Sequence, residues 1–197
     1  MKTFLHVGCG PVKKSQIPGF KEDDWAEIRF DIDKNVNPDI EGTLTDMSQV
    51  ETGSVDAIYS SHNIEHVYPH EVPIVLNEFY RVLKADGMVV VICPDLQSVS
   101  KEIVNDKLYD PLYTTSESHP ISPIDILYGW RLPISQGNEY MAHKCGFTYT
   151  TLSKVFDEAG FKSRCGGRSE NKWELFLVAF KQKKSEEDAI KIANHFV

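Results

Sequence analysis

Closely spaced cysteines are missing from this sequence. Its four cysteines, Cys9, Cys93, Cys145 and Cys165, lie far apart and form no C-x-x-C pair. Neither a zinc knuckle nor a disulfide framework is therefore expected. We interpret them as free thiols, with Cys9 and Cys93 acting as small core residues.

Long apolar runs and long basic runs are also missing. No segment approaches the roughly 18 consecutive apolar residues of a membrane span, and the N-terminus begins a strand without a signal-peptide pattern. The 21 Lys and Arg residues are outnumbered by 29 Asp and Glu, and the densest basic cluster is Lys181, Lys183 and Lys184. A large nucleic-acid surface needs clustered positive charge. We therefore predict a cytoplasmic protein with no membrane or nucleic-acid partner.

The length of the chain is sufficient for one domain with its own core. It has 197 residues, of which 41% are hydrophobic and 11% aromatic, as is ordinary for a globular protein. We expect a single domain over 1–197 with an insertion at about 97–146, where prolines and aromatic residues interrupt the regular pattern. Such an insertion would act as a lid or a substrate-binding segment.

A strand followed by a glycine turn opens the chain. The apolar run Phe4-Leu5-His6-Val7 ends in Gly8-Cys9-Gly10, the pattern of a buried strand feeding a tight turn. The next apolar run, Glu27 to Ile32, carries Asp31 and is followed by Asp33. Carboxylates about twenty residues after a glycine turn indicate a nucleotide-binding α/β unit.

The remaining elements alternate between strands and helices. A strand at 55–60 is followed by Ser61-His62-Asn63, and apolar residues at helical spacing then predict a helix over 72–83 that Asp86-Gly87 terminates. The continuously apolar run 88–93 predicts a central parallel strand. Beyond the insertion we expect a helix at 151–159, a strand beginning at 161–165, and a strand at 174–180. These last two strands should pair antiparallel at one edge of the sheet. A final helix should begin at about Ser185, with Asp188 at a capping-box position.

In this order the motifs resemble those of class I S-adenosylmethionine-dependent methyltransferases, over nearly the whole chain. Leu5 to Gly10 is similar to the first motif of that family. Ser54 to Ser60 with Ile64-Glu65-His66, and Glu78 to Lys84 with Asp86-Gly87, are similar to its middle motifs. The resemblance implies a Rossmann-like α/β fold, with a mostly parallel seven-stranded sheet, an antiparallel edge and helices on both faces. It also implies an enzyme that transfers a methyl group from S-adenosylmethionine, releasing S-adenosylhomocysteine, to a small-molecule acceptor.

The resemblance also assigns residues to the cofactor. The glycine loop would pass beneath the methionine portion, and Asp31, with Asp33 in reserve, would accept the ribose hydroxyls. The adenine would contact Asp46 through its amino group and Met47 through its ring. The family commonly has an acid where this chain has His6, so the anchoring of the cofactor ammonium group would be rearranged. The predicted cofactor residues are His6, Gly8, Cys9, Gly10, Asp31, Asp46, Met47 and His62.

Residues for catalysis are chosen by position and chemistry. Methyl transfer needs a base only if the acceptor is a hydroxyl or a protonated amine. We predict His66 and His143 as general base or substrate contacts, because imidazole titrates near neutral pH. A purely structural bond from His66 to the backbone is the alternative for that residue. Because no N-terminal helices precede the first strand, the cofactor would be covered by 97–146, by the N-terminal loop or by another subunit of a homo-oligomer.

Three other functions compete with this interpretation. A dinucleotide fingerprint would need glycine at position 13, which is Lys13. The run from His62 to His66 matches H-x-x-E-H, so a zinc hydrolase that uses His62, Glu65 and His66 is an alternative, although Pro69 should interrupt the helix before His70. We predict no metal site. A non-catalytic, cofactor-binding module is the third alternative.

Overall fold

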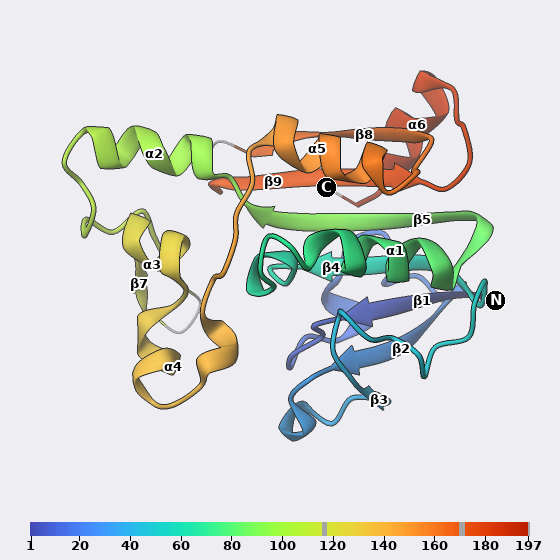
Figure 1. Cartoon of the computed structure of the whole chain (residues 1–197), viewed down its shortest axis with the longest axis horizontal. Helices are drawn as coiled ribbons and strands as arrows, with labels where there is room; N and C mark the ends of the chain where they lie inside the picture. Colours follow the sequence, from blue (N-terminus) through green and yellow to red (C-terminus); the bar gives the residue numbers. More distant parts are fainter. Residues whose placement is uncertain (116–117, 170–171, 197) are drawn as a thin grey trace.

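A seven-stranded sheet forms the centre of the computed structural model, which describes residues 1–115, 118–169 and 172–196 (Figure 1). Its strand order is β3-β2-β1-β4-β5-β9-β8. The first five strands of this order are parallel, and β9 is antiparallel to both β5 and β8. The predicted fold class is confirmed. The strands are β1 Lys2–Val7, β2 Trp25–Asp31, β3 Ile40–Glu41, β4 Val55–Ser61, β5 Leu83–Pro94, β8 Ser163–Ser169 and β9 Glu174–Phe180.

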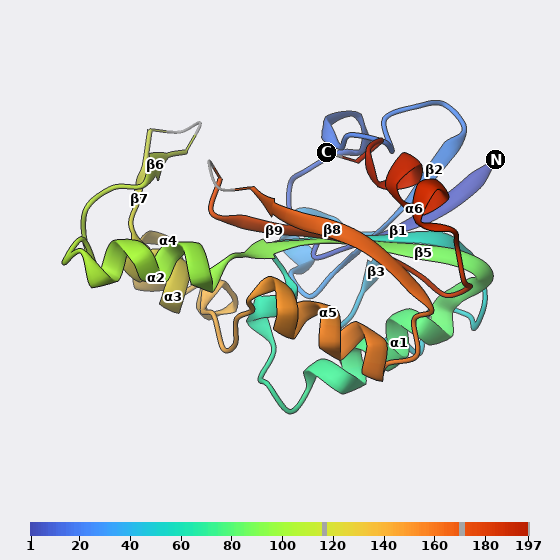
Figure 2. The ribbon, with the colours of Figure 1, turned by 90° about the horizontal axis from the view of Figure 1, so that it is seen from above.

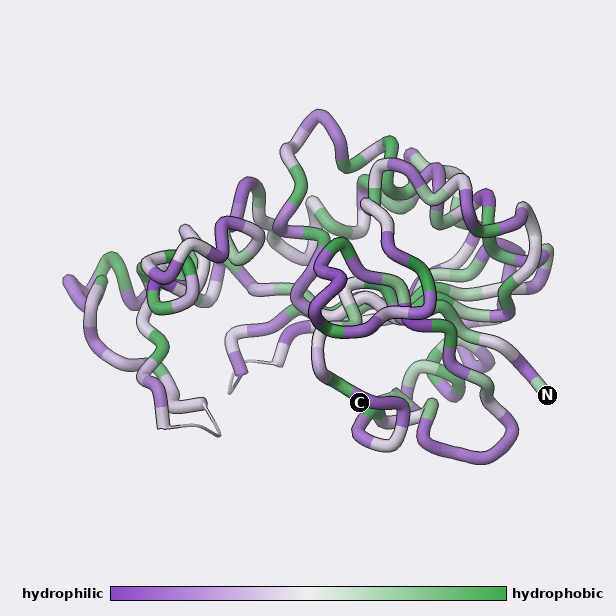
Figure 3. The backbone as a smooth tube through the Cα atoms, turned by 90° about the horizontal axis from the view of Figure 1, so that it is seen from below, coloured by the Kyte–Doolittle hydropathy of each residue, from purple (hydrophilic) through white to green (hydrophobic). Residues whose placement is uncertain are grey.

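The central strands are buried on both faces, because successive side chains point to opposite sides of the sheet. In β5, Val89 and Val91 belong to one hydrophobic cluster, whereas Val90 between them belongs to the other. In β1, Leu5 and Phe4 divide in the same way. Hydrophobic residues accordingly gather along the central strands, and polar residues gather in the outer loops (Figure 3).

Helices cover both faces of the sheet (Figure 2). The first face is covered by α1, Val72–Val82, and α5, Tyr149–Glu158. The opposite face is covered by α6, Glu186–Ala193, whose N-cap is Ser185. The Asp188 N–H donates to the Ser185 side chain at 3.1 Å, so the predicted cap is confirmed.

Two predicted boundaries were wrong. The helix α1 ends at Val82, and β5 begins at once with Leu83, so Asp86 and Gly87 lie inside the strand instead of ending the helix. A register irregularity between β4 and β5 accommodates this early start. The strand β8 continues through its glycines to Ser169. Glycine at position 166 allows β9 to pair closely there, because a Cβ would lie 2.1 Å from the Phe176 carbonyl oxygen.

The inserted segment lies beyond the carboxyl ends of the parallel strands (Figure 1). A small core of Val99, Ile121 and Ile126 holds it together. It is tied to the sheet by Lys144 and Cys145, whose N–H groups donate to the Glu65 carbonyl oxygen at 2.8 and 3.1 Å. Its elements are α2 Leu96–Val104, β6 Tyr113–Thr114, β7 Pro120–Ile121, α3 Pro123–Tyr128, α4 Arg131–Ser135 and the 3-10 turn η4 Glu139–Met141. In the part of the chain that the structure describes, none of the helices has the length and apolar character to span a membrane.

Candidate functional site

The glycine loop follows β1 in a conformation that suits glycine. Gly8 and Gly10 have φ angles of +60° and +48°. A Cβ at Gly8 would lie 2.3 Å from Cγ of Asn63, whereas one at Gly10 would meet nothing within 4 Å. Only glycine suits position 8, because of both its positive φ angle and the Asn63 side chain packed against it. The side of the loop next to Gly10 is open.

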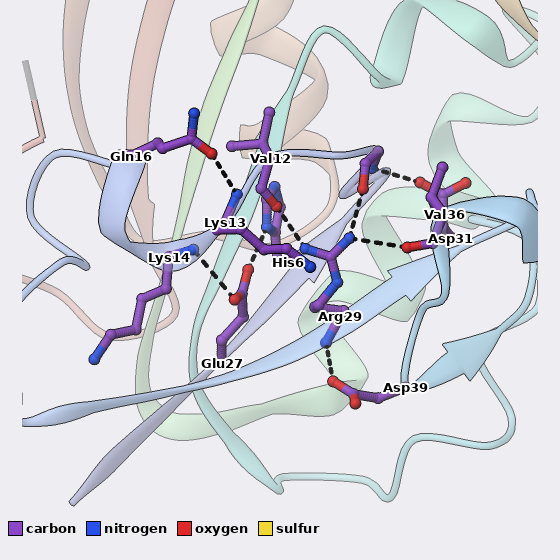
Figure 4. A network of polar contacts seen from close by, with 11 residues as sticks. His6, Val12, Lys13, Lys14, Gln16, Glu27, Arg29, Asp31, Val36 and Asp39 are labelled. Atoms are coloured by element: carbon purple, nitrogen blue, oxygen red, sulfur yellow. Dashed lines mark hydrogen bonds and ion pairs between the residues drawn. The ribbon is translucent and has the colours of Figure 1, made fainter.

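Asp31 fixes the glycine loop from the end of β2. Its Oδ2 accepts the Gly10 N–H at 2.8 Å (Figure 4). Its Oδ1 accepts the Asp33 N–H at 2.9 Å. Asp33 itself caps the 3-10 turn η2, Lys34–Val36. The carboxylate thus holds two backbone segments in place, and its oxygens retain lone pairs for further donors.

Arg29 holds the other side of the loop, a role that sequence reasoning missed. Its side chain is buried, and it donates to the carbonyl oxygens of Gly10 and Val12, each at 2.5 Å (Figure 4). Its position inside an alternating strand gave no signal of this role, because the partners are main-chain atoms of another segment.

His6 lies behind the loop instead of facing a cofactor. Its Nδ1 is 2.7 Å from Glu27 Oε1, and its ring packs edge-on against Tyr59 at 5.3 Å between centroids (Figure 4). Burial lowers the pKa of His6 below its usual value, despite the neighbouring Glu27 carboxylate. The predicted cofactor contact of the His6 side chain is not matched by this geometry.

A cavity of about 430 Å³ opens beside the loop, at the carboxyl ends of the strands. Its volume lies within the range of small-molecule and cofactor sites. Among the predicted cofactor residues, Gly8, Gly10, Asp31 and His62 line it. The cavity is also lined by residues from four further segments: Asp33 and Val36; Gly42 to Thr45; Asn63, His66 and Val67; and Asn138, Tyr140, Met141 and Lys144.

Cys9, Asp46 and Met47 are not among the lining residues. Cys9 is buried, and burial raises the pKa of its thiol to about 11. Met47 is fully buried in the core under α1, and its N–H donates to Glu78 at 2.9 Å. Asp46 is exposed and accepts the Ser48 N–H at 3.0 Å. Hydrogen bonding from the Ser48 side chain, and then from this N–H, lowers the pKa of Asp46.

The segment just before Asp46 takes the predicted place beside the cavity. Leu44 and Thr45 line the cavity where Met47 and Asp46 were expected. A signal was available in the sequence, because Leu44, Met47 and Val50 recur at intervals of three and all three are buried. That spacing places all three side chains on the inner side of the segment, and Leu44 alone among them also borders the cavity.

His62 leaves β4 with a positive φ of 50°, which is uncommon for histidine. Its Nε2 lies 3.0 Å from Glu174 and its Nδ1 lies 3.6 Å from Glu65. Burial alone would lower the pKa of His62, but the two carboxylates raise it well above its usual value. His62 is therefore a cation at neutral pH.

A second cavity of about 230 Å³ adjoins the first. His62, His66 and Met141 line both cavities, so these residues mark the place where the two meet. The inserted segment and the start of β9 supply most of the other walls. These walls include Tyr113, Ile121, Asp125, Ile126, Trp130, His143, Lys172, Trp173 and Glu174.

The two histidines predicted for catalysis come together at this junction. Their ring centroids lie 4.8 Å apart, with the ring planes 72° from parallel. The Nδ1 of His66 is 3.1 Å from the Ala142 carbonyl oxygen, and the Nδ1 of His143 is 2.7 Å from that of Ile126. Because a carbonyl only accepts hydrogen bonds, each Nδ1 carries the proton and each Nε2 is left as an acceptor.

The helical arrangement that a zinc hydrolase would need is not present. His62 precedes the turn with its positive φ, and only Ile64–His66 form a 3-10 turn, η3. His70 is exposed and stacks on Tyr68 instead of following His66 on one helical face. The H-x-x-E-H run therefore does not present its two histidines on one helical face, although Glu65 and His66 do lie in the site.

The comparisons with known proteins agree with this architecture. Residues 5–91 match a family model described as a methyltransferase domain, and no curated protein matches the sequence. A structure from Thermotoga maritima, described as a SAM-dependent methyltransferase and possible histamine N-methyltransferase, is 14% identical with a TM-score of 0.60 over 92% of this chain and 83% of that chain.

Two further structures share the fold. The 1,6-didemethyltoxoflavin-N1-methyltransferase of Burkholderia thailandensis, solved with its substrate and S-adenosylhomocysteine, is 13% identical with a TM-score of 0.57 over 92% of this chain and 71% of that chain. The CMeT domain of the citrinin polyketide synthase is 10% identical with a TM-score of 0.56 over 93% of this chain. The chain spans about half, 47%, of the length of that last structure.

Proposed function

We propose that this chain is an S-adenosylmethionine-dependent methyltransferase, and that it transfers a methyl group to a small molecule bound in the second cavity. The observation that carries this proposal is the junction of the two cavities at His62, His66 and Met141. One cavity offers a glycine loop and a carboxylate, and the other offers mainly apolar walls. Donor and acceptor would thus meet at one point, as in-line displacement requires.

Unpartnered polar atoms in the first cavity fit the amino-acid end of the cofactor. The Nδ2 of Asn63 and the Oδ1 of Asn138 are buried without hydrogen-bond partners among the described residues, and both side chains line this cavity. An amide N–H would donate to a carboxylate, and an amide oxygen would accept from an ammonium group. Asn138 would thus bind the ammonium group, which the family commonly binds with an acid at the position that His6 occupies in this chain.

The rest of the first cavity fits the nucleoside. We assign Gly8 and Gly10 to the close approach of the loop, Asp31 to the ribose hydroxyls, and Leu44 and Thr45 to the adenine. When bound, S-adenosylmethionine supplies an electrophilic methyl group. The residues of this cavity would hold the cofactor with that group near His62 and His66, which line both cavities, and His6 and Cys9 would support the loop from behind.

The inserted segment 97–146 would act as the lid and as the acceptor site. It contributes Asn138, Tyr140, Met141 and Lys144 to the first cavity and most of the walls of the second. Residues 116–117 of this segment lie outside the described part of the chain. The acceptor should be small, because the second cavity measures about 230 Å³, and partly aromatic, because Tyr113, Trp130 and Trp173 line it.

His66 and His143 are the residues that we assign to the acceptor. Each presents an Nε2 that no main-chain group holds, and both line the second cavity. Such nitrogens can bind the acceptor or take part in its deprotonation.

The free cysteines fit a reducing compartment, which supports a cytoplasmic location.

Calorimetry with S-adenosylhomocysteine tests the cofactor assignment. Asp31→Ala should weaken binding by roughly tenfold or more, the effect of losing a charge-assisted hydrogen bond and the Gly10 anchor. Asp46→Ala is the matched control, because Asp46 lies outside the cavity, and it should bind within about twofold of the wild type. Absence of binding by the folded wild type would remove the proposed function.

Turnover separates an enzyme from a non-catalytic module. A pool of small aromatic metabolites incubated with the wild type and S-adenosylmethionine should yield S-adenosylhomocysteine and products one methyl group heavier, detected by mass spectrometry. His66→Asn should bind S-adenosylhomocysteine normally and lose most of this turnover. A protein that binds the cofactor but methylates nothing in the pool would favour the non-catalytic alternative.

A further inference from the structure

Glu65 is a buried carboxylate with unused hydrogen-bonding capacity. Its exposed fraction is 1%, and neither of its carboxylate oxygens has a hydrogen-bond partner among the described residues. Its nearest cationic atom, His62 Nδ1, is 3.6 Å away, which is too long for a hydrogen bond. A buried carboxylate that accepts no hydrogen bond is costly even beside a cation at 3.6 Å, so such a group is suited to a further ligand.

Two histidines face this carboxylate. One carboxylate oxygen of Glu65 and one ring nitrogen from each of His66 and His143 all lie within 4.8 Å of one another. In both histidines the Nδ1–H is held by a carbonyl oxygen, which leaves Nε2 available. A ring nitrogen fixed by a backbone carbonyl, with the opposite nitrogen free, is the arrangement that orients metal-ligating histidines in proteins.

Backbone hydrogen bonds connect the segments that carry these groups. The Glu65 carbonyl oxygen accepts the N–H groups of Lys144 and Cys145, which immediately follow His143. The cluster therefore joins the inserted segment to the turn after β4 at a fixed point. His66 lines both cavities and His143 lines the second, so a ligand held by the cluster would be reached from the second cavity.

We propose that Glu65, His66 and His143 bind a divalent transition-metal ion of the Zn²⁺ type, and that the ion holds the acceptor. Two imidazoles and one carboxylate suit such an ion and leave a position open for a further ligand. Tetrahedral ligands at 2.0–2.2 Å from zinc lie roughly 3.4 Å apart, so the three side chains would close by about 1.5 Å at most. His62 would keep its partner Glu174, at 3.0 Å, when Glu65 turns to the ion.

The acceptor class follows from this site, and this step rests on the proposed function. With His66 and His143 bound to the ion, they would act on the acceptor only through it: an acceptor with a hydroxyl or thiol would bind the open position through oxygen or sulfur and release its proton to solvent. Its lone pair would then form the new bond to the methyl carbon as the carbon–sulfur bond of the donor breaks. The donor sulfur keeps that electron pair and becomes the thioether of S-adenosylhomocysteine.

Titration of the chelator-stripped full-length protein with ZnCl₂ tests the site. We expect one Zn²⁺ per chain with a dissociation constant below about 1 μM, and Glu65→Gln and His143→Ala should each weaken binding at least tenfold. His70→Ala is the matched control, because His70 is exposed and lies outside the cluster, and it should bind as the wild type does. Co²⁺ should give the visible absorption of a tetrahedral site in the wild type and lose it in His143→Ala.

Three outcomes would overturn the site: no binding tighter than about 10 μM, unchanged binding in both cluster variants, or an equal loss in His70→Ala. S-adenosylhomocysteine binding and circular dichroism are measured on every variant, so that an unfolded variant is recognised. His143→Gln provides a milder second substitution. Because the metal titration needs no cofactor, a protein that binds S-adenosylhomocysteine but not zinc contradicts only this site, and the reverse result contradicts only the proposed function.

Discussion

At the level of single residues, the site depends on side chains that hold backbone rather than ligand. Asp31 accepts a hydrogen bond from the N–H of Gly10, and Arg29 donates one to the carbonyl oxygen of Gly10. Gly8 is fixed by its positive φ and by the Asn63 side chain against it. The loop thus keeps its shape without help from a cofactor, and binding would require little reorganisation.

Asp95, which follows β5, is a second residue that holds backbone in place. It is fully buried and accepts from Gln97 N–H at 3.0 Å, from the Ser98 hydroxyl at 2.5 Å and from Arg168 Nε at 2.8 Å. Asp95→Asn should lower the free energy of unfolding by about 1–3 kcal/mol, because the partly exposed Arg168 and two further donors then face a neutral amide. Urea unfolding at pH 7 measures this change.

The same carboxylate has a pH signature. Burial alone would raise the pKa of Asp95, but Arg168, Ser98 and Gln97 together hold it below its usual value. Its stabilisation is therefore complete above the unfolded-state pKa of about 3.9 and is lost as the pH falls through the lowered folded-state pKa. The difference between wild type and Asp95→Asn should shrink below about pH 4. A difference that is constant from pH 7 to 3, or equal to that of the exposed control Asp86→Asn, would contradict this role.

The placement of a residue beside the cavity is predictable from the sequence where an element fixes its position. Gly8, Gly10 and Asp31 line the first cavity because a strand end places each of them there. His6 and Met47 do not, because the face toward which a side chain points depends on the alternation within β1 and on core packing. Arg29 and Asn138 gave no sequence signal, because their roles arise from contacts between distant segments.

At the level of elements, α6 and the segment after it complete the core on one face of the sheet. Phe196 is buried, and its ring centroid lies 4.8 Å from that of Phe20, in the loop between β1 and β2. The same ring packs against Gly19, because a Cβ on that residue would lie only 2.3 Å from Cδ1 of Phe196. The C-terminal segment thus covers a surface that the short connection between β1 and β2 leaves open.

Shortening Phe196 should measure the contribution of this contact. Phe196→Ala should cost about 2–4 kcal/mol of unfolding free energy, because it leaves a cavity against Phe20. Ile190→Ala on α6 is the control, since Ile190 is 43% exposed, and it should cost no more than about 0.5 kcal/mol. Equal effects of the two substitutions in urea unfolding would show that Phe196 does not stabilise this face.

Helices and strands were predictable from the sequence where a single pattern of apolar residues runs along the whole element. The helix α1 and the strand β9 were predicted almost to the residue, because burial on one face or on both sets their patterns. The early start of β5 was not, since it depends on an irregular pairing of Val55 with Leu83. The continuation of β8 depends on the close approach of Gly166 to β9, which no local pattern records.

For the whole molecule, the proposed function depends on the position of the inserted segment. The glycine loop, the end of β2 and the turn after β4 meet at the carboxyl ends of the parallel strands, where ligands bind in open α/β sheets. The sequence indicated that a lid was needed and that 97–146 could supply it. It could not indicate which residues of that segment face the cofactor, because short helices and loops carry no periodicity that fixes their orientation.

Hydrogen exchange on the whole chain tests whether the insertion closes over the cofactor. Saturating S-adenosylhomocysteine should slow amide exchange roughly tenfold or more in the segments 8–10 and 31–36, several of whose residues line the first cavity, because a ligand that binds only the closed, folded state reduces local opening. If 97–146 is the lid, 138–144 must slow as well, since Asn138, Tyr140, Met141 and Lys144 line the same cavity from the other side. Residues 106–112 are the internal control, because they belong to the insertion but line neither cavity. Protection of the glycine loop without protection of 138–144 would mean that the cofactor is covered by something other than this segment.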